Sequence, residues 1–222
     1  MHDLLSIADH MAVAVFAVSG ALMASRKQMD IFGFILLGTV TGVGGGSLCD
    51  VLLDAPVFWI AAPGYAVTCI VVSAATFFLA HLVQSRFRVI LWFDAVGLAL
   101  FAVLGAGKAL SLDAAPIIAV VMGVMSATFG GIIRDVLGGE VPLLLRREIY
   151  VTAALMGALV YVVLVELGID VVLAGGAGFV VGFLIRALAL HRGWSLPAYK
   201  GRPGRSENEL REMGILLEDE EE

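Results

Sequence analysis

Long apolar stretches alternate with short polar connections along most of the chain. Each stretch holds about 20 mostly apolar residues, the length that an α-helix needs to cross a hydrocarbon core of about 30 Å. The stretches cover residues 4–25, 31–53, 64–84, 90–110, 115–137, 149–167 and 171–190. The pattern predicts an all-α integral membrane protein with seven transmembrane helices. A largely flexible tail, with proline, glycine and many charges, is predicted over residues 191–222.

The first half of this pattern recurs in the second half. Residues 9–54 match residues 94–139 at a constant offset of 85 and without a gap. The identical positions include a phenylalanine, a glycine pair and the acid that follows it, namely Phe16 and Phe101, Gly45–Gly46 and Gly130–Gly131, and Asp50 and Asp135. Such duplication in an apolar chain is typical of transporters and channels. It predicts three-helix repeats at 1–84 and 90–167, with a seventh helix at 171–190 outside the repeat.

The basic residues of the short loops predict an orientation in the membrane. They follow only the first, third and fifth spans, as Arg26, Lys27, Arg86, Arg88, Arg146 and Arg147. The positive-inside rule therefore puts the N-terminus outside and the C-terminal tail in the cytoplasm. Because each repeat has an odd number of spans, the second copy is expected to be inverted relative to the first.

Composition agrees with a membrane protein and excludes several other classes. Hydrophobic residues make up 60% of the chain and charged residues only 15%, with a mean hydropathy of +0.97, whereas soluble domains hold roughly 25% charged residues. The net charge of -6 comes largely from the acidic end at 218–222, and the low basic content argues against nucleic-acid binding. Cys49 and Cys69 are expected to be free, buried thiols. Since no metal-ligand cluster or phosphate loop is apparent, no cofactor is expected.

Glycines gather halfway along one span of each repeat, at Gly42, Gly44, Gly45 and Gly46 and at Gly130 and Gly131. Glycine in a helix costs about 1 kcal/mol relative to alanine, so a kink or break is expected there. Broken backbone at that depth is tolerated only when it is buried or lines a watery cavity. Bends at Gly45 and Gly130 therefore predict a permeation path. The alternative is that these glycines only allow close helix crossing, the role expected for Gly175, Gly178 and Gly182 in the last span.

Four residues after each glycine pair stands an acid, Asp50 or Asp135, and the predicted spans also contain Arg134 and Lys108. A charge near the bilayer centre costs roughly 2.5–3.5 kcal/mol and therefore normally faces a cavity or a partner. Neighbours in sequence point about 100° apart on a helix, so Arg134 is expected to find its partner on another helix, with Asp50 the candidate by symmetry. A role in permeation or gating is favoured, and a purely structural ion pair is the alternative.

Two further acids, Asp9 and Asp94, also match between the repeats. They lie near the predicted helix starts, where the helix dipole alone favours an acid. They are therefore not expected to take part in the site. Lys108 has Met23 as its repeat equivalent, so its charge is an addition to one half.

These residues resemble the prokaryotic members of the trimeric intracellular cation (TRIC) channel family, which are also labelled glycine transporters. The resemblance rests on the doubled pattern of phenylalanine, Gly-Ala and a glycine-rich helix ending in aspartate, and it covers residues 5 to about 200. It implies a homotrimer in the bacterial inner membrane, surrounded by membrane lipids, with one pore per subunit for monovalent cations such as K⁺ and Na⁺. The pore would be lined by the two bent middle helices. The pore and gating residues that it implies are Gly44, Gly45, Gly46, Asp50, Lys108, Gly130, Gly131, Arg134 and Asp135.

Three function classes remain open on the residues alone. Inverted repeats with broken helices suit a passive cation channel, but they also suit a carrier that moves a small solute such as glycine by alternating access. An intramembrane hydrolase would need Ser47 within hydrogen-bond reach of a base such as His10 or His81. That class is disfavoured because Ser47 has Ile132 as its repeat equivalent and neither histidine lies in a motif. The family resemblance favours the channel.

Overall fold

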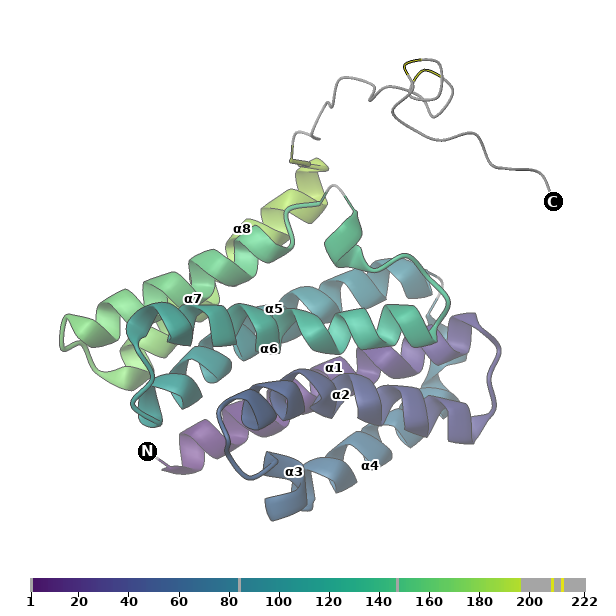
Figure 1. Cartoon of the computed structure of the whole chain (residues 1–222). Helices are drawn as coiled ribbons and strands as arrows, with labels where there is room; N and C mark the ends of the chain where they lie inside the picture. The colour runs from purple at the N-terminus through teal and green to yellow at the C-terminus, as the bar shows by residue number, and fades with distance from the viewer. Residues whose placement is uncertain (1, 84, 147, 197–208, 210–212, 214–222) are drawn as a thin grey trace.

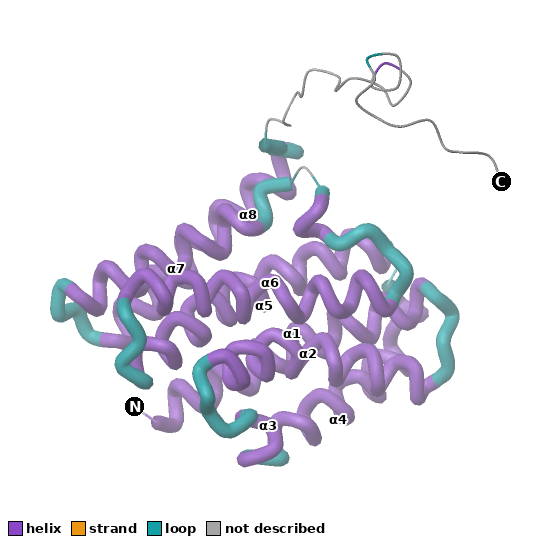
Figure 2. The backbone as a smooth tube through the Cα atoms, in the orientation of Figure 1, coloured by secondary structure: helices purple, strands orange, loops and turns teal. Residues whose placement is uncertain are grey.

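The chain folds into a bundle of long helices joined by short loops (Figure 1). The computed structural model describes residues 2–83, 85–146, 148–196, 209 and 213. Within that part of the chain the regular elements are all helical (Figure 2). One isolated bridge joins Glu148 to Ser195. The elements are α1 (His2–Arg26), α2 (Ile31–Leu52), α3 (Phe58–Ala61), α4 (Gly64–Leu79), η1 (Ala80–Leu82), α5 (Arg86–Ser111), α6 (Pro116–Leu137), η2 (Leu143–Leu145), α7 (Val151–Glu166) and α8 (Val171–Arg192).

These helices agree closely with the predicted spans. Six of them are long and apolar enough to cross a membrane, and α7 is a shorter apolar helix of 16 residues. The span predicted over 64–84 ends earlier than expected, because α4 stops at Leu79 and a tighter 3₁₀ turn follows. Most of the tail predicted over 191–222 lies outside the described residues, as does Arg147.

Local sequence signals set several helix ends. Asp30 caps α2 by accepting a hydrogen bond from the Gly33 N–H at 2.8 Å, and Asp170 caps α8 in the same way. Such caps satisfy N–H groups that have no partner inside the helix. Pro116 begins α6, where its fixed φ suits the first helical position. Gly193 ends α8 with a φ of 65°, a conformation that other residues rarely adopt.

The basic loop residues gather at one end of the bundle around Glu140. The Glu140 carboxylate lies 3.0 Å from Lys27, 3.4 Å from Arg26 and 3.8 Å from Arg146. The hydrogen bond from Lys27 and the nearby guanidinium groups lower the pKa of Glu140. The Arg26 and Arg146 guanidinium groups both lie over the Phe87 ring, 4.9 and 5.4 Å from its centre. The loops after α1, η1 and α6 therefore meet at one end, as the charge pattern predicted.

Equivalent positions in the two repeats make equivalent contacts. A Cβ atom added to Gly20 of α1 would lie 2.5 Å from Thr41 Oγ1 of α2, and one added to Gly105 of α5 would lie 2.6 Å from Ser126 Cβ of α6. Gly20 and Gly105 are separated by the repeat offset, and so are Thr41 and Ser126. The crossing of α1 with α2 therefore repeats in the crossing of α5 with α6. The fold consists of two inverted three-helix repeats and the additional helix α8.

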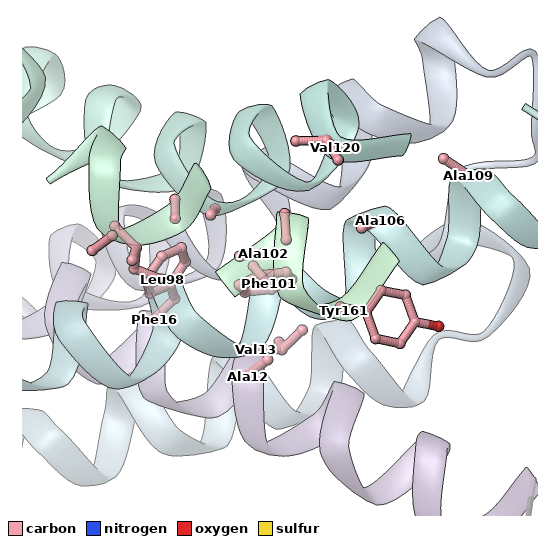
Figure 3. Close-up of a cluster of buried hydrophobic side chains, with 14 of the residues drawn as sticks. Ala12, Val13, Phe16, Leu98, Phe101, Ala102, Ala106, Ala109, Val120 and Tyr161 are labelled. Atoms are coloured by element: carbon pink, nitrogen blue, oxygen red, sulfur yellow. The ribbon is translucent and has the colours of Figure 1, made fainter. Parts of the chain in front are cut away.

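The centre of the bundle lies where the two repeats meet. The rings of Phe16 and Phe101 are 5.1 Å apart, and Figure 3 shows both within the buried cluster that also contains Leu98 and Ala102. Phe16 and Phe101 are repeat equivalents. Two equivalent residues can touch only near the axis that relates their repeats. This ring pair therefore marks that axis.

Helix α8 packs against α7 through small residues, and the two helices run side by side in Figure 1. A Cβ added to Gly178 would lie 2.7 Å from the Gly157 carbonyl oxygen, and one added to Gly182 would lie 3.2 Å from the Ala153 carbonyl oxygen. The close packing predicted for these two glycines is confirmed. Gly175 is different, because its added Cβ would meet only a Val103 methyl group at 3.6 Å.

Candidate permeation site

A cavity of about 560 Å³ lies among the helices at the end of the bundle opposite the basic loops. Its walls come from every helix from α1 to α8 and are mostly apolar. Three charged side chains, Asp9, Asp50 and Lys108, reach it, together with the aromatic rings of Phe58 and Tyr65. A concave apolar site with a few convergent polar groups is the usual form of a ligand or ion site.

Asp50 is the most buried charge at this cavity. Its side chain is 1% exposed, and Lys108 donates a charge-assisted hydrogen bond to Oδ1. Oδ2 accepts the Phe58 N–H at 2.7 Å. The Lys108 side chain is 34% exposed, and its ammonium lies 6.0 Å from the centre of the Phe58 ring. Asp50 stands in the last turn of α2 rather than at the centre of the helix, so it lies nearer one end of the bundle than the sequence suggested.

A second charged cluster lies around Arg134, which is completely buried. Its Nε donates to Asp135 Oδ1 at 2.8 Å, and its Nη1 donates to Asp94 Oδ1 at 2.6 Å and to the Ser19 hydroxyl. Asp135 Oδ2 accepts the Leu143 N–H at 2.9 Å. One guanidinium thus joins α1, α5 and α6. Breaking such a buried pair leaves an uncompensated charge, which is strongly destabilising.

The two clusters are built on equivalent positions of the repeats. The equivalent pairs are Asp9 and Asp94, Asp50 and Asp135, Phe58 and Leu143, Cys49 and Arg134, and Met23 and Lys108. The carboxylates and their backbone N–H donors therefore recur, whereas the cation comes from a different helix in each half. In the second half the guanidinium fills the space between the acids. In the first half the corresponding residue, Cys49, lines the cavity.

The prediction that Arg134 pairs with Asp50 was wrong. Arg134 does not bind Asp50, which pairs with Lys108, and it does bind its own neighbour Asp135. Side chains of adjacent residues leave a helix about 100° apart. The arginine side chain is nevertheless long enough to turn its Nε toward the neighbouring carboxylate, while Nη1 reaches Asp94 on α5.

The structure also corrects the interpretation of Asp9 and Asp94. Asp94 is completely buried and binds Arg134, and Asp9 lines the cavity. The predicted span began at residue 90, but α5 begins at Arg86. Asp94 therefore lies in the third turn of its helix, beyond the reach of the terminal dipole. The signal that could have identified both acids was their match at the repeat offset.

The glycines do not break their helices. Both α2 and α6 are continuous over the glycine positions, so a break at Gly45 or Gly130 is wrong, whereas a bend there stays a prediction. A Cβ on Gly45 would overlap the Ser126 carbonyl oxygen, and one on Gly130 would lie 2.6 Å from the Thr41 carbonyl oxygen. These contacts are repeat equivalents, since Thr41 and Ser126 are also separated by 85 residues. Gly45 and Gly130 therefore allow the close crossing of α2 and α6.

The other three glycines of the predicted site face side chains. A Cβ on Gly44 would come too close only to the tip of Ile133, at 2.8 Å, and would lie in ordinary contact with the Gly130 Cα at 3.9 Å. One on Gly46 would lie 2.7 Å from the Phe58 ring, beside the cavity, and one on Gly131 would lie 2.7 Å from the Tyr150 hydroxyl. Gly46 and Gly131 thus give the aromatic residues beside each acidic cluster room to approach.

Ser47 and the cysteines carry no catalytic arrangement among the described residues. The Ser47 hydroxyl donates to the Val43 carbonyl at 2.7 Å and accepts from the Trp59 indole at 2.9 Å, with neither His10 nor His81 as a partner. Cys49 and Cys69 are free and buried, as expected. Within the described part of the chain no three His, Cys, Asp or Glu side chains are grouped to hold a metal ion.

Comparison with known proteins identifies the family. The family model described as Glycine transporter matches residues 6–81 and 91–166. The UPF0126 inner membrane protein YadS of Escherichia coli (strain K12) is 43% identical over 197 residues, which cover 86% of this chain and 94% of that protein. The TRIC trimeric intracellular cation channel orthologue from Rhodobacter sphaeroides is 55% identical, with a TM-score of 0.84 over 86% of this chain and 99% of that chain. A prokaryotic TRIC channel crystallised in 0.5 M KCl is 33% identical, with a TM-score of 0.81 over 88% of this chain and 100% of that chain.

These similarities discriminate among the function classes. The solved relatives are ion channels and not enzymes, which excludes the hydrolase and does not favour the carrier. The apolar helices and the similarity to an inner membrane protein both indicate that the chain is a multi-pass membrane protein. The chain belongs to the prokaryotic trimeric intracellular cation channel family, whose sequence model is described as Glycine transporter.

Proposed function

We propose that the protein is a homotrimeric channel for monovalent cations such as K⁺ and Na⁺ in the bacterial inner membrane, with one pore in each subunit. The observation that carries the proposal is the cavity with its two carboxylates, which lies between the repeats of a fold shared with cation channels. The pore runs from this cavity along the crossing of α2 and α6 toward the Arg134 cluster. Residues 1–84 and 90–167 are the two repeats that form the pore, 171–190 is the additional seventh helix and 191–222 is the tail.

Charge supports a preference for cations. The cavity cluster holds two acids, Asp9 and Asp50, against the single base Lys108. The second cluster holds Asp94 and Asp135 against Arg134 alone. Each end of the proposed path therefore carries one more acid than base. An uncompensated carboxylate in a site of low dielectric attracts cations and repels anions.

The proposed pore and gating roles follow from these positions. Gly45 and Gly130 bring α2 and α6 together at the centre of the path, while Gly44, Gly46 and Gly131 let the side chains of Ile133, Phe58 and Tyr150 approach it. The ion pairs at the two ends act as gates. The gate at the cavity is the pair of Lys108 with Asp50, and the other gate is Arg134 with Asp94 and Asp135.

Replacing either partner of the cavity pair should change ion selectivity in opposite directions. Asp50→Asn keeps an acceptor for the Phe58 N–H but leaves the Lys108 charge unopposed, so the preference for K⁺ over Cl⁻ should fall by about tenfold or more. A unit charge at about 4 Å is worth roughly 4 kcal/mol at an effective dielectric of 20. Lys108→Met should raise the preference. The reversal potential of reconstituted protein in a KCl gradient measures both effects.

Asp113→Asn is the matched control for this pair. Asp113 is exposed in the loop after α5, and its change should leave the reversal potential where it is. An unaltered reversal potential in both Asp50→Asn and Lys108→Met would mean that selectivity resides in backbone carbonyls or elsewhere in the path.

The proposed orientation places the N-terminus outside and the tail in the cytoplasm, with lipid around the apolar helix faces. Single cysteines at 26 and 86 should then react with a membrane-impermeant thiol reagent only from the cytoplasmic side, and one at 55 only from outside. Cys69 is buried, and Cys49, which lines the cavity, is replaced by alanine in the background for these variants. Labelling of positions 55 and 86 from the same side would contradict this topology.

A further inference from the structure

The two acidic clusters differ in one respect that the repeat makes visible. In the second half the Arg134 guanidinium binds both Asp94 and Asp135. In the first half Lys108 binds Asp50, while Asp9 has no hydrogen bond or ion pair among the described residues and lines the cavity. Asp9 thus occupies the position of Asp94 without the cation that Asp94 holds.

The space for that cation is present. The repeat equivalent of Arg134 is Cys49, whose short side chain lines the cavity of about 560 Å³. The equivalent of Ser19, which accepts a hydrogen bond from Arg134, is Leu104, which also lines the cavity. The first half therefore keeps the acid, as Asp9, but has no arginine and has a more apolar wall than the second half. An apolar wall adds little to the affinity for a free metal ion. An organic cation would gain affinity from both the carboxylate and the apolar wall.

The chain itself indicates the type of cation. A guanidinium presents a planar fork of donors that suits a carboxylate, and its flat face stacks on aromatic rings. The first half supplies the Asp9 carboxylate together with the rings of Phe58 and Tyr65, which pack edge to face with centroids 5.0 Å apart. We propose that the cavity is a binding site for an organic guanidinium that carries an apolar substituent. Its guanidinium binds Asp9, and its substituent lies against Val13, Leu104 and Val165.

Lys108 sets the affinity of this site. Its ammonium is partly exposed to the cavity and already occupies Asp50, so it repels a second cation and leaves only Asp9 available. Removing the Lys108 charge would leave both Asp9 and Asp50 available to the ligand. One guanidinium could then bind two carboxylates, as Arg134 does in the second half. Lys108 therefore competes with the ligand. This ligand occupies the vestibule of the pore proposed above, and in that respect alone the inference rests on the proposed function.

Calorimetry on the purified full-length protein in detergent tests the site, with phenylguanidinium as the probe and neutral phenylurea as its isosteric control. Phenylguanidinium should bind once per subunit, and phenylurea should bind at least about tenfold more weakly, the difference expected from a charge-assisted hydrogen bond. Asp9→Asn should weaken phenylguanidinium binding by a similar factor. Lys108→Met should strengthen it, and Asp113→Asn should leave it unchanged. Equal binding of the two probes, or unchanged binding in Asp9→Asn, would overturn the proposal.

A second variant covers the case in which Asp9→Asn does not fold. Cys49→Arg places a tethered guanidinium where the second half carries its own, so it should abolish phenylguanidinium binding. Binding with unaltered affinity in Cys49→Arg would also overturn the site. The calorimetric readout requires no ion flux. Binding without current would support the ligand site and contradict the proposed channel. Current without binding would support the channel and contradict the ligand site.

Discussion

Replacing Arg134 by methionine is expected to destabilise the protein by about 3–5 kcal/mol, the largest effect of any single substitution considered. The change leaves Asp94 and Asp135 buried without their cation, and removing one partner of a buried ion pair typically costs this much. The melting temperature of the detergent-solubilised protein, followed by the loss of its monodisperse gel-filtration peak, measures the effect.

Two companion variants identify the cause. Arg146→Met removes an arginine at the protein surface that lies 3.8 Å from Glu140, and its cost should stay within about 1 kcal/mol. Adding Asp94→Asn to Arg134→Met removes one of the two orphaned charges and should recover part of the lost stability. A wild-type melting temperature in Arg134→Met would show that the two acids do not depend on the guanidinium.

Alanine at Gly45 should cost far more stability than alanine at the adjacent Gly44. A methyl group at Gly45 overlaps the Ser126 carbonyl oxygen, which is backbone of a crossing helix and cannot move alone. At Gly44 the methyl group overlaps only the end of the Ile133 side chain, which can rotate away. Overpacking a close contact costs about 1–3 kcal/mol or more, so Gly45→Ala should melt well below Gly44→Ala.

The equivalent glycine of the second repeat extends this test. Gly130→Ala should behave like Gly45→Ala, because its added methyl group would meet the Thr41 carbonyl oxygen and the Phe16 ring. Equal melting temperatures for Gly44→Ala, Gly45→Ala and Gly130→Ala would mean that α2 and α6 do not cross as closely as described.

Hydropathy alone was sufficient to predict most of the fold. A helix that must cross a bilayer is specified by length and apolarity, so the limits of α2 and α6 came within one residue of prediction. The repeat was equally visible, because Gly20, Gly105 and their partners are constrained by the same crossing in both halves.

The partners of the charged residues could not be predicted in the same way. Whether Arg134 meets Asp50 or Asp94 depends on the rotation and crossing of α5 and α6 relative to α2, which no local pattern contains. The glycines pose a related problem. Gly45 suits both a bend and a close approach, and the close approach becomes visible only through the Ser126 carbonyl on the neighbouring helix.

Single-channel recording of the purified protein in a planar bilayer, under a KCl gradient, tests the central claim most directly. A channel with an acidic path predicts unitary current steps that reverse close to the K⁺ equilibrium potential. Transport that saturates without unitary steps, or steps that reverse at the Cl⁻ equilibrium potential, would contradict a cation channel in this chain.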